Sequence, residues 1–222
     1  MTDAATTTNP DPGVADAAAI AHYGVIVGLL EMLPVPFVDD FLQERALRHL
    51  VEKLLADHGR TFDPAEAEPL WAGEDSGIFA KAGGFVKGLV MKPVKKLFRT
   101  VTLVFAVRRA ALDGAEALLL GHTVDRLLGR GWLADAHDAA RRREEAESIR
   151  VAVDRAWDNA DVQGLKALVR SALKRFGAED KQAAKRQLEA DLETGEARGM
   201  FARFDAAVDA RLAEVAEERR RA

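Results

Sequence analysis

Apolar residues recur at helical spacing along most of this 222-residue chain, and nowhere do they alternate with the period of a β-strand. The Asn-Gly pairs that mark tight hairpins are also missing. A chain with this pattern buries its apolar faces by packing helix on helix. The sequence therefore predicts an all-α fold, a multi-helix bundle with a charged, extended helical C-terminal third.

Prolines, glycines and capping residues predict where the helices begin and end. Pro34 and Pro36 stop a first apolar helix, and Asp39 or Asp40 caps a second one that Gly59 ends. Asp63 followed by Pro64 predicts one brief helix. The longer predicted helices span 17–33, 39–58, 78–131 with an interruption at Pro93, 138–159, 162–176, 178–193 and 196–221.

Composition divides the chain into three predicted parts. Residues 1–16 form a disordered leader, 17–137 an apolar and basic helical core domain, and 138–222 a charged helical region, either packed on the core or appended as a helical hairpin. The leader lacks the basic and apolar regions of a secretory signal. The longest apolar runs fall short of the roughly 20 residues of a bilayer span, so no transmembrane helix is expected.

The absence of cysteine excludes disulfides and thiolate chemistry, and it fits a reducing compartment. We expect a cytoplasmic, bacterial-type protein that can lie peripherally at the inner face of the membrane. Charge is distributed unevenly around a total of −4: residues 1–75 hold 4 basic and 14 acidic side chains, 76–138 hold 10 and 5, and 139–222 hold 18 and 17. Such asymmetry points to an interaction surface, although the acidic front could also pack beside the basic middle and neutralise it.

The stretch from Ser76 to Leu112 contains no acidic residue. We call residues 78–109 the basic segment. Lys92, Lys95, Lys96 and Arg99 are spaced to share one helical face, with Phe98 among the apolar residues opposite them. The candidate anion-binding cations are Lys81, Lys87, Lys92, Lys95, Lys96, Arg99, Arg108 and Arg109, and the candidate apolar contacts are Phe85, Leu89 and Phe98.

A basic face beside an apolar face is typical of a helix that lies on an anionic membrane or docks into an acidic groove. An ordinary amphipathic helix, with its apolar face in the core and its lysines in water, explains the same residues. Nucleic acid is a disfavoured partner because the whole chain is acidic and no known DNA- or RNA-binding motif is present. We therefore predict a non-enzymatic helical protein that contacts an anionic membrane through the basic segment.

Small residues at helical spacing predict close helix packing. Gly lowers helix propensity by roughly 1 kcal/mol relative to Ala, so glycines within a helix suggest that another backbone approaches closely. The candidate packing positions are Gly24, Gly28, Gly84, Gly88 and Gly114.

The stretch 33–40 places Pro34, Val35 and Pro36 directly before Phe37-Val38-Asp39-Asp40. It resembles the Pro-apolar-Pro-x-x-Asp elements that follow Gly-rich apolar helices in bacterial membrane-associated helical proteins of the EcsC kind. The resemblance implies a helical protein that associates with membranes. A helix–turn–helix corner with an Asp cap explains the same residues without any function, so no family is assigned.

Residues that could carry catalysis or hold a metal are scattered. The pairs His49/Glu52 and His122/Asp125 have i, i+3 spacing, but the paired motifs of zinc and di-iron sites are missing. We interpret all five histidines as surface or capping residues, and we expect no cofactor and no metal. The three serines lie outside any nucleophile motif. An enzyme is not excluded by the sequence, but no motif supports one.

The last predicted helix offers an alternative function. Met200, Phe201 and Phe204 begin an apolar stripe that continues through Val208, Leu212 and Val215, and this stripe could pair with another helix in the same chain or in a second subunit. The alternative is therefore a protein–protein adaptor or self-associating scaffold that uses the charged C-terminal helices, with a homo-oligomer as one form. The basic end, Arg219–Arg221, reads as a frayed, solubilising tail.

Overall fold

The computed structural model describes residues 39–72, 99–157, 163–176, 190–192 and 194–221, together with Ile20, Tyr23, Gly24, Ile26, Val27 and Arg186. At residues 39–42, 99–110, 168 and 172–176 it describes the backbone alone. Across these residues the chain forms helices and no strand, which confirms the predicted all-α class.

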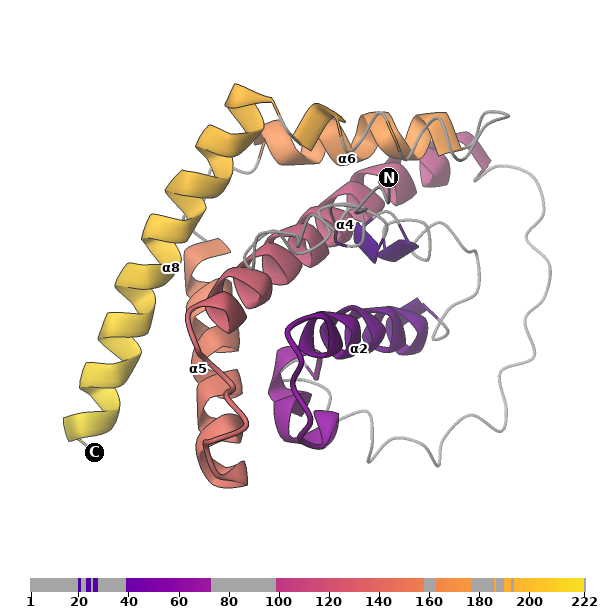
Figure 1. The fold of residues 1–222 in the computed structure, drawn as a ribbon. Coiled ribbons are helices and arrows are strands. Elements are labelled where there is room, and N and C mark those ends of the chain that lie inside the picture. The colour runs from indigo at the N-terminus through magenta and orange to yellow at the C-terminus, as the bar shows by residue number, and fades with distance from the viewer. Residues whose placement is uncertain are drawn as a thin grey trace, which may run out of the picture.

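The elements are α2 (Asp39–Asp57), the 3-10 helix η1 (Pro64–Leu70), α4 (Arg99–Gly129), α5 (Ala139–Trp157), α6 (Gln163–Phe176) and α8 (Gly195–Arg221). Figure 1 shows α4 crossing the middle of the molecule, with α6 along one end of it. α2 lies on one side of α4 and α5, and α8 runs along the opposite, outer side of α5. Helix α4 contacts α2, α5, α6 and α8, so it is the central element.

Local signals in the sequence set most helix ends. Gly59 adopts a φ of 66°, which lets the chain turn sharply after α2. Asp63 accepts a hydrogen bond of 2.9 Å from the Ala65 amide and so caps η1, with Pro64 in its first turn. Asp138 caps α5 through the Arg141 amide at 2.8 Å, and the Thr194 hydroxyl accepts from the Ala197 amide at 3.3 Å at the start of α8. These ends agree with the predicted helices to within two residues.

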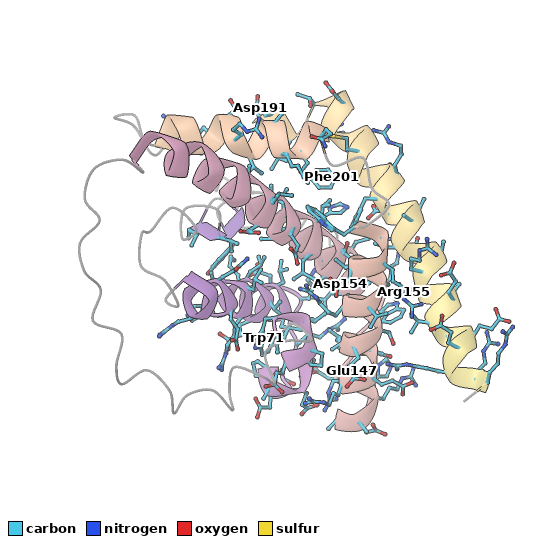
Figure 2. The ribbon with its side chains drawn as sticks, turned by 180° about the vertical axis from the view of Figure 1, so that it is seen from behind. Trp71, Glu147, Asp154, Arg155, Asp191 and Phe201 are labelled. Carbon is cyan, nitrogen blue, oxygen red and sulfur yellow. The ribbon has the colours of Figure 1, made fainter. Side chains whose placement is uncertain are left out.

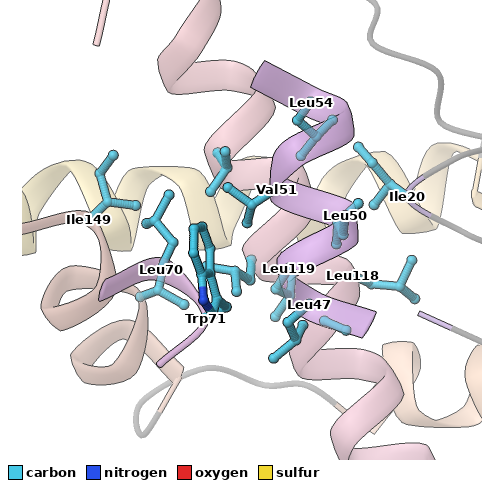
Figure 3. Packing of buried hydrophobic residues seen from close by; sticks show 14 of the residues in the cluster. Ile20, Leu47, Leu50, Val51, Leu54, Leu70, Trp71, Leu118, Leu119 and Ile149 are labelled. Carbon is cyan, nitrogen blue, oxygen red and sulfur yellow. The ribbon is translucent and has the colours of Figure 1, made fainter. Parts of the chain in front are cut away.

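The C-terminal half of α4 is buried on almost every side. Its fully buried residues include Ala115, Leu118 and Leu120, while α2 contributes Leu50 and Leu54 from the facing side. Figure 3 shows Leu47 and Leu50 of α2 near Leu118 and Leu119, and it shows Leu70 of η1 and the following Trp71 between Ile149 and Val51. A helix that is apolar all round belongs in the middle of a bundle, which explains why α4 is the hub.

Two arginines of α5 attach it to neighbouring elements. Arg142 is 8% exposed; it donates to Glu66 at 2.6 Å and to the His137 carbonyl, and it stacks over the Phe62 ring. The hydrogen bond that Arg142 donates to the Glu66 carboxylate raises the pKa of Arg142. Burial alone would lower the pKa of Arg150. The carboxylates of Asp154 on α5 and of Glu116 on α4 outweigh burial and raise this pKa. Both guanidinium groups therefore stay charged inside the bundle.

The charged C-terminal third, residues 138–222, contacts helices of the preceding part of the chain. α5 packs against η1 and α4, and α8 packs against α5 and α4. The proposed division into residues 17–137 and 138–222 stays a prediction, as does the leader at 1–16, whose residues lie outside the described ones.

Candidate functional site

Most of the predicted anion-binding surface lies outside the described residues. Residues 73–98 are not described, and Arg99, Arg108 and Arg109 belong to α4 through their backbone alone. The predicted site residues outside the description are Lys81, Phe85, Lys87, Leu89, Lys92, Lys95, Lys96, Phe98, Gly28, Gly84 and Gly88. The last part of the basic segment, residues 99–109, forms the beginning of α4, the central helix.

Two predicted packing glycines, Gly24 and Gly114, lie next to each other. A Cβ atom added at Gly24 would lie 2.5 Å from Leu118 Cγ and 3.1 Å from the Gly114 carbonyl oxygen. Gly121, which the sequence reading passed over, is in a similar position: an added Cβ would lie 3.0 Å from both Ile20 Cγ2 and Leu50 Cδ2. The backbone at Gly24 thus approaches that of α4 closely, and the side chains of Ile20 and Leu50 pack against Gly121.

Helix α8 meets α4 through a cluster of charged side chains. His122 and Arg126 lie on α4 and Arg130 directly follows its end, at i, i+4 and i+8, while Asp205 and Asp209 lie at i and i+4 on α8. We call these five residues the α4–α8 charge cluster. His122 Nε2 lies 3.1 Å from Asp205 Oδ2, Arg126 Nη1 lies 2.8 Å from Asp209 Oδ1, and Arg130 Nη1 lies 3.0 Å from Asp209 Oδ2.

In the α4–α8 charge cluster, the carboxylates of Asp205 and Asp209 face side chains that carry or can carry positive charge. Burial alone would raise the pKa of Asp209, but hydrogen bonds from Arg130 and Arg126 outweigh burial and lower it. Arg126 also approaches Asp205, with Nε 3.0 Å from Oδ1. The His122 ring packs against Phe201 with 4.5 Å between ring centroids, so an aromatic contact closes one end of the cluster.

A second set of ion pairs joins the far end of α8 to α5. Arg155 donates to both carboxylate oxygens of Glu218 at 2.9 and 3.0 Å. The hydrogen bond from Arg155 lowers the pKa of Glu218. Arg219 Nη1 lies 2.8 Å from Glu144 Oε1 of α5, and its Nη2 lies 3.4 Å from Glu147 Oε2. Figure 2 shows Glu147 and Arg155 on the side of α5 that faces α8. Arg219 is therefore part of an interface, which corrects its interpretation as a frayed tail.

Three histidines make contacts that the sequence reading did not find. His58, just after α2, places Nε2 2.6 Å from Asp125 Oδ1 on α4, and His137 Nδ1 lies 3.0 Å from Glu145 Oε2. With His122, these side chains contact acids on other elements or across a turn, so the surface-or-cap interpretation is wrong for them. The i, i+3 spacing identified the His49–Glu52 contact at 3.3 Å but not the partner of His122. No periodic signal could have paired residues 67 or 83 positions apart.

A histidine held by a carboxylate can serve as a general base when a nucleophile or substrate lies within reach. Of the serines with described side chains, Ser148 donates to the Glu144 carbonyl at 2.7 Å within α5. Among the described residues, no three side chains of metal-ligating type converge on a common point. In the part of the chain that the structure describes, the pairs of His58 and His122 connect α4 to the end of α2 and to α8, and the pair of His137 closes the turn before α5.

No helix among the described residues has the length and apolarity to cross a bilayer. No protein-family model matches the chain, and comparison with curated proteins and with solved structures gave no significant match.

Proposed function

We propose that this protein contacts an anionic membrane surface through the basic segment, residues 78–109. The observation that carries the proposal is the run of eight cations without one carboxylate between Ser76 and Leu112, in a chain whose net charge is −4. A local positive field of this kind attracts anionic lipid head groups, each nearby cation contributing about 1 kcal/mol to binding.

Ion pairs in the described front of the molecule support the proposal. The acidic front, residues 1–75, could have neutralised the basic segment, but four of its described carboxylates have other partners. Glu52 and Asp57 pair with Arg48 and Lys53 within α2. Glu66 and Glu68 pair with Arg142 and Arg143 of α5, at 2.6 and 3.3 Å. These four carboxylates are thus engaged within α2 and with α5, which supports a basic segment whose field is available to an external anion.

The test is co-sedimentation with vesicles that contain anionic lipid, comparing wild type with a variant in which Lys92, Lys95, Lys96 and Arg99 are changed to Glu. Removing four cations worth about 1 kcal/mol each predicts at least a hundredfold weaker partitioning, since 1.4 kcal/mol is tenfold. Neutral vesicles should bind neither protein.

The matched control changes Arg45, Arg170, Arg198 and Arg203 to Glu. All four are exposed and lie on α2, α6 and α8, away from the basic segment in sequence. Both variants have the same net charge, so net charge alone predicts equal loss of binding, whereas the proposal predicts loss in the first variant only. Circular dichroism verifies that each variant is folded. Equal binding of wild type to neutral and anionic vesicles would contradict the electrostatic mechanism.

The alternative, a scaffold that self-associates through α8, has less support. Phe204, Val208 and Val215 are buried within the molecule, and Phe201 and Leu212 pack against the same core. The apolar stripe of α8 is thus used in the same chain, so self-association would have to use its charged face.

A further inference from the structure

Helix α8 is attached differently from its neighbour α5. Of the 27 residues of α8, those buried are Ala197, Phe204, Val208 and Val215. The shorter α5, with 19 residues, buries six, including the completely buried Ile149 and Val153 of the core. α8 therefore lies at the edge of the bundle, and apolar burial contributes less to its attachment.

Charge pairs hold both halves of α8. The α4–α8 charge cluster anchors the first half, and the pairs of Glu218 and Arg219 with α5 anchor the second. The carboxylates of two of these pairs are open to solvent, with the side chain of Asp209 42% exposed and that of Glu218 59% exposed, whereas the side chain of Asp205 is 22% exposed. Dissolved ions and competing anions can therefore reach them, and salt weakens such pairs.

We propose that α8 acts as a clasp: charge pairs hold it on the bundle, and an anionic membrane releases it. The membrane would do so by competing with Asp205 and Asp209 for His122, Arg126 and Arg130. The inference rests on the proposed function, because the competing surface is the one that the basic segment would bind. His122 and Arg126 lie on the helix that begins with Arg99, and Arg130 directly follows that helix, so opening α8 would extend the positive surface along α4.

The guanidinium of Arg126 has a hydrogen-bond donor that such a competitor could use. It is 13% exposed, and its buried Nη2 has no hydrogen-bond partner among the described residues. Asp205 and Asp209 contact it through Nε and Nη1 only. A phosphate group offers more acceptor oxygens than either carboxylate and can satisfy the forked donor set. By linkage, a surface that opens α8 binds more tightly to a protein whose α8 is already open.

The first test is hydrogen exchange of the full chain, read by mass spectrometry in α8 and α5 separately. Raising salt should increase exchange in α8 several-fold and leave α5 unchanged. The variant D205N/D209N keeps the side-chain shapes and should show the faster α8 exchange already at low salt. The control E214Q/E217Q also removes two carboxylates from α8, but these pair with Arg211 and Arg221 of α8 itself. Salt-independent protection of α8, or equal effects of the two variants, would overturn the clasp.

The second test adds vesicles to the wild type. Anionic vesicles should speed α8 exchange, neutral vesicles should not, and D205N/D209N should bind anionic vesicles more tightly than E214Q/E217Q does. If wild type binds anionic vesicles while α8 stays protected, the inference is wrong and the proposed function stands. If wild type binds no vesicle but salt opens α8, the proposed function and membrane competition are both wrong, and the charge-held clasp remains.

Discussion

Gly24 illustrates how a single missing side chain positions a helix against α4. The closest atoms to an added Cβ would be Leu118 Cγ at 2.5 Å and the Gly114 carbonyl oxygen at 3.1 Å. A distance of 2.5 Å is too short for any carbon–carbon contact, and Cγ cannot move without shifting the whole leucine. Leu118 is itself completely buried, so it has little room to move.

We expect Gly24→Ala to lower the free energy of unfolding by about 1–3 kcal/mol, the usual effect of overpacking a core. Urea denaturation measures it. Gly195→Ala is the control, because nothing lies within 4 Å of its added Cβ. The control should change stability by less than about 0.5 kcal/mol. A Gly24→Ala protein as stable as the control would show that the two backbones are not in close contact.

Asp209 makes stability depend on pH. Its pKa is lowered in the folded state, so its contribution is fully present above the unfolded pKa, about 3.9, and is lost as pH falls through the folded pKa. We expect Asp209→Asn to destabilise the protein at pH 7, and the difference from wild type to shrink steadily below about pH 4. Urea titrations at several pH values measure this difference. A difference independent of pH would mean that Asp209 acts through packing.

At the level of elements, Arg60 joins the exit of α2 to the end of α4. Its Nη2 donates to the Leu128 carbonyl at 2.8 Å and to the Trp132 carbonyl at 3.1 Å. The carbonyl groups of the last turn of a helix have no partner within the helix. A cation at this end also interacts favourably with the negative end of the helix dipole. Arg60 therefore fixes where α4 stops relative to α2.

We expect Arg60→Met to cost about 1–3 kcal/mol of stability, because the Trp132 and Leu128 carbonyl groups both lose their charged donor, and Leu128 keeps the Gly131 amide at 3.1 Å. Arg45→Met, at an exposed position of α2, should be nearly neutral. Thermal melts of both variants provide the comparison. Equal melting temperatures would mean that water replaces the guanidinium without loss.

Element boundaries were predictable because their signals are local. Gly59, the Asp63-Pro64 pair and Asp138 act on backbone groups within a few residues of themselves. Pairings between elements were not predictable in the same way. The periodicity of a helix shows which face is apolar, but not which face of another helix it meets, so the contact of Arg142 with Glu66 had no signature in the sequence.

For the whole molecule, the distribution of charge is the property that connects fold and proposed function. Four described acids of residues 1–75, Glu52, Asp57, Glu66 and Glu68, bind cations of α2 and α5, and ion pairs attach α8 near both of its ends. The sequence predicted the local positive field from its composition alone. Where that field lies on the folded molecule was not predictable, because placement depends on packing partners far along the chain.

We expect binding of wild type to anionic vesicles to fall steeply with salt. The Debye length is about 10 Å at 0.1 M and about 3 Å at 1 M, so the lysines of the basic segment lose most of their attraction to lipid over this range. Sedimentation at several salt concentrations gives the dependence. Binding that persists undiminished in high salt would assign the contact to apolar insertion by residues such as Phe85, Leu89 and Phe98.

The central position of α4 has a consequence for how the protein is made. Synthesis proceeds from the N-terminus, so the leucines of α2 leave the ribosome before α4 and α5 have been translated. Until then Leu50 and Leu54 have no core to enter, although both are completely buried in the finished molecule. The nascent chain thus exposes the apolar face of α2 while residues 58–129 are translated. In this interval the chain is most prone to aggregate, and a chaperone that covers this face would be most effective.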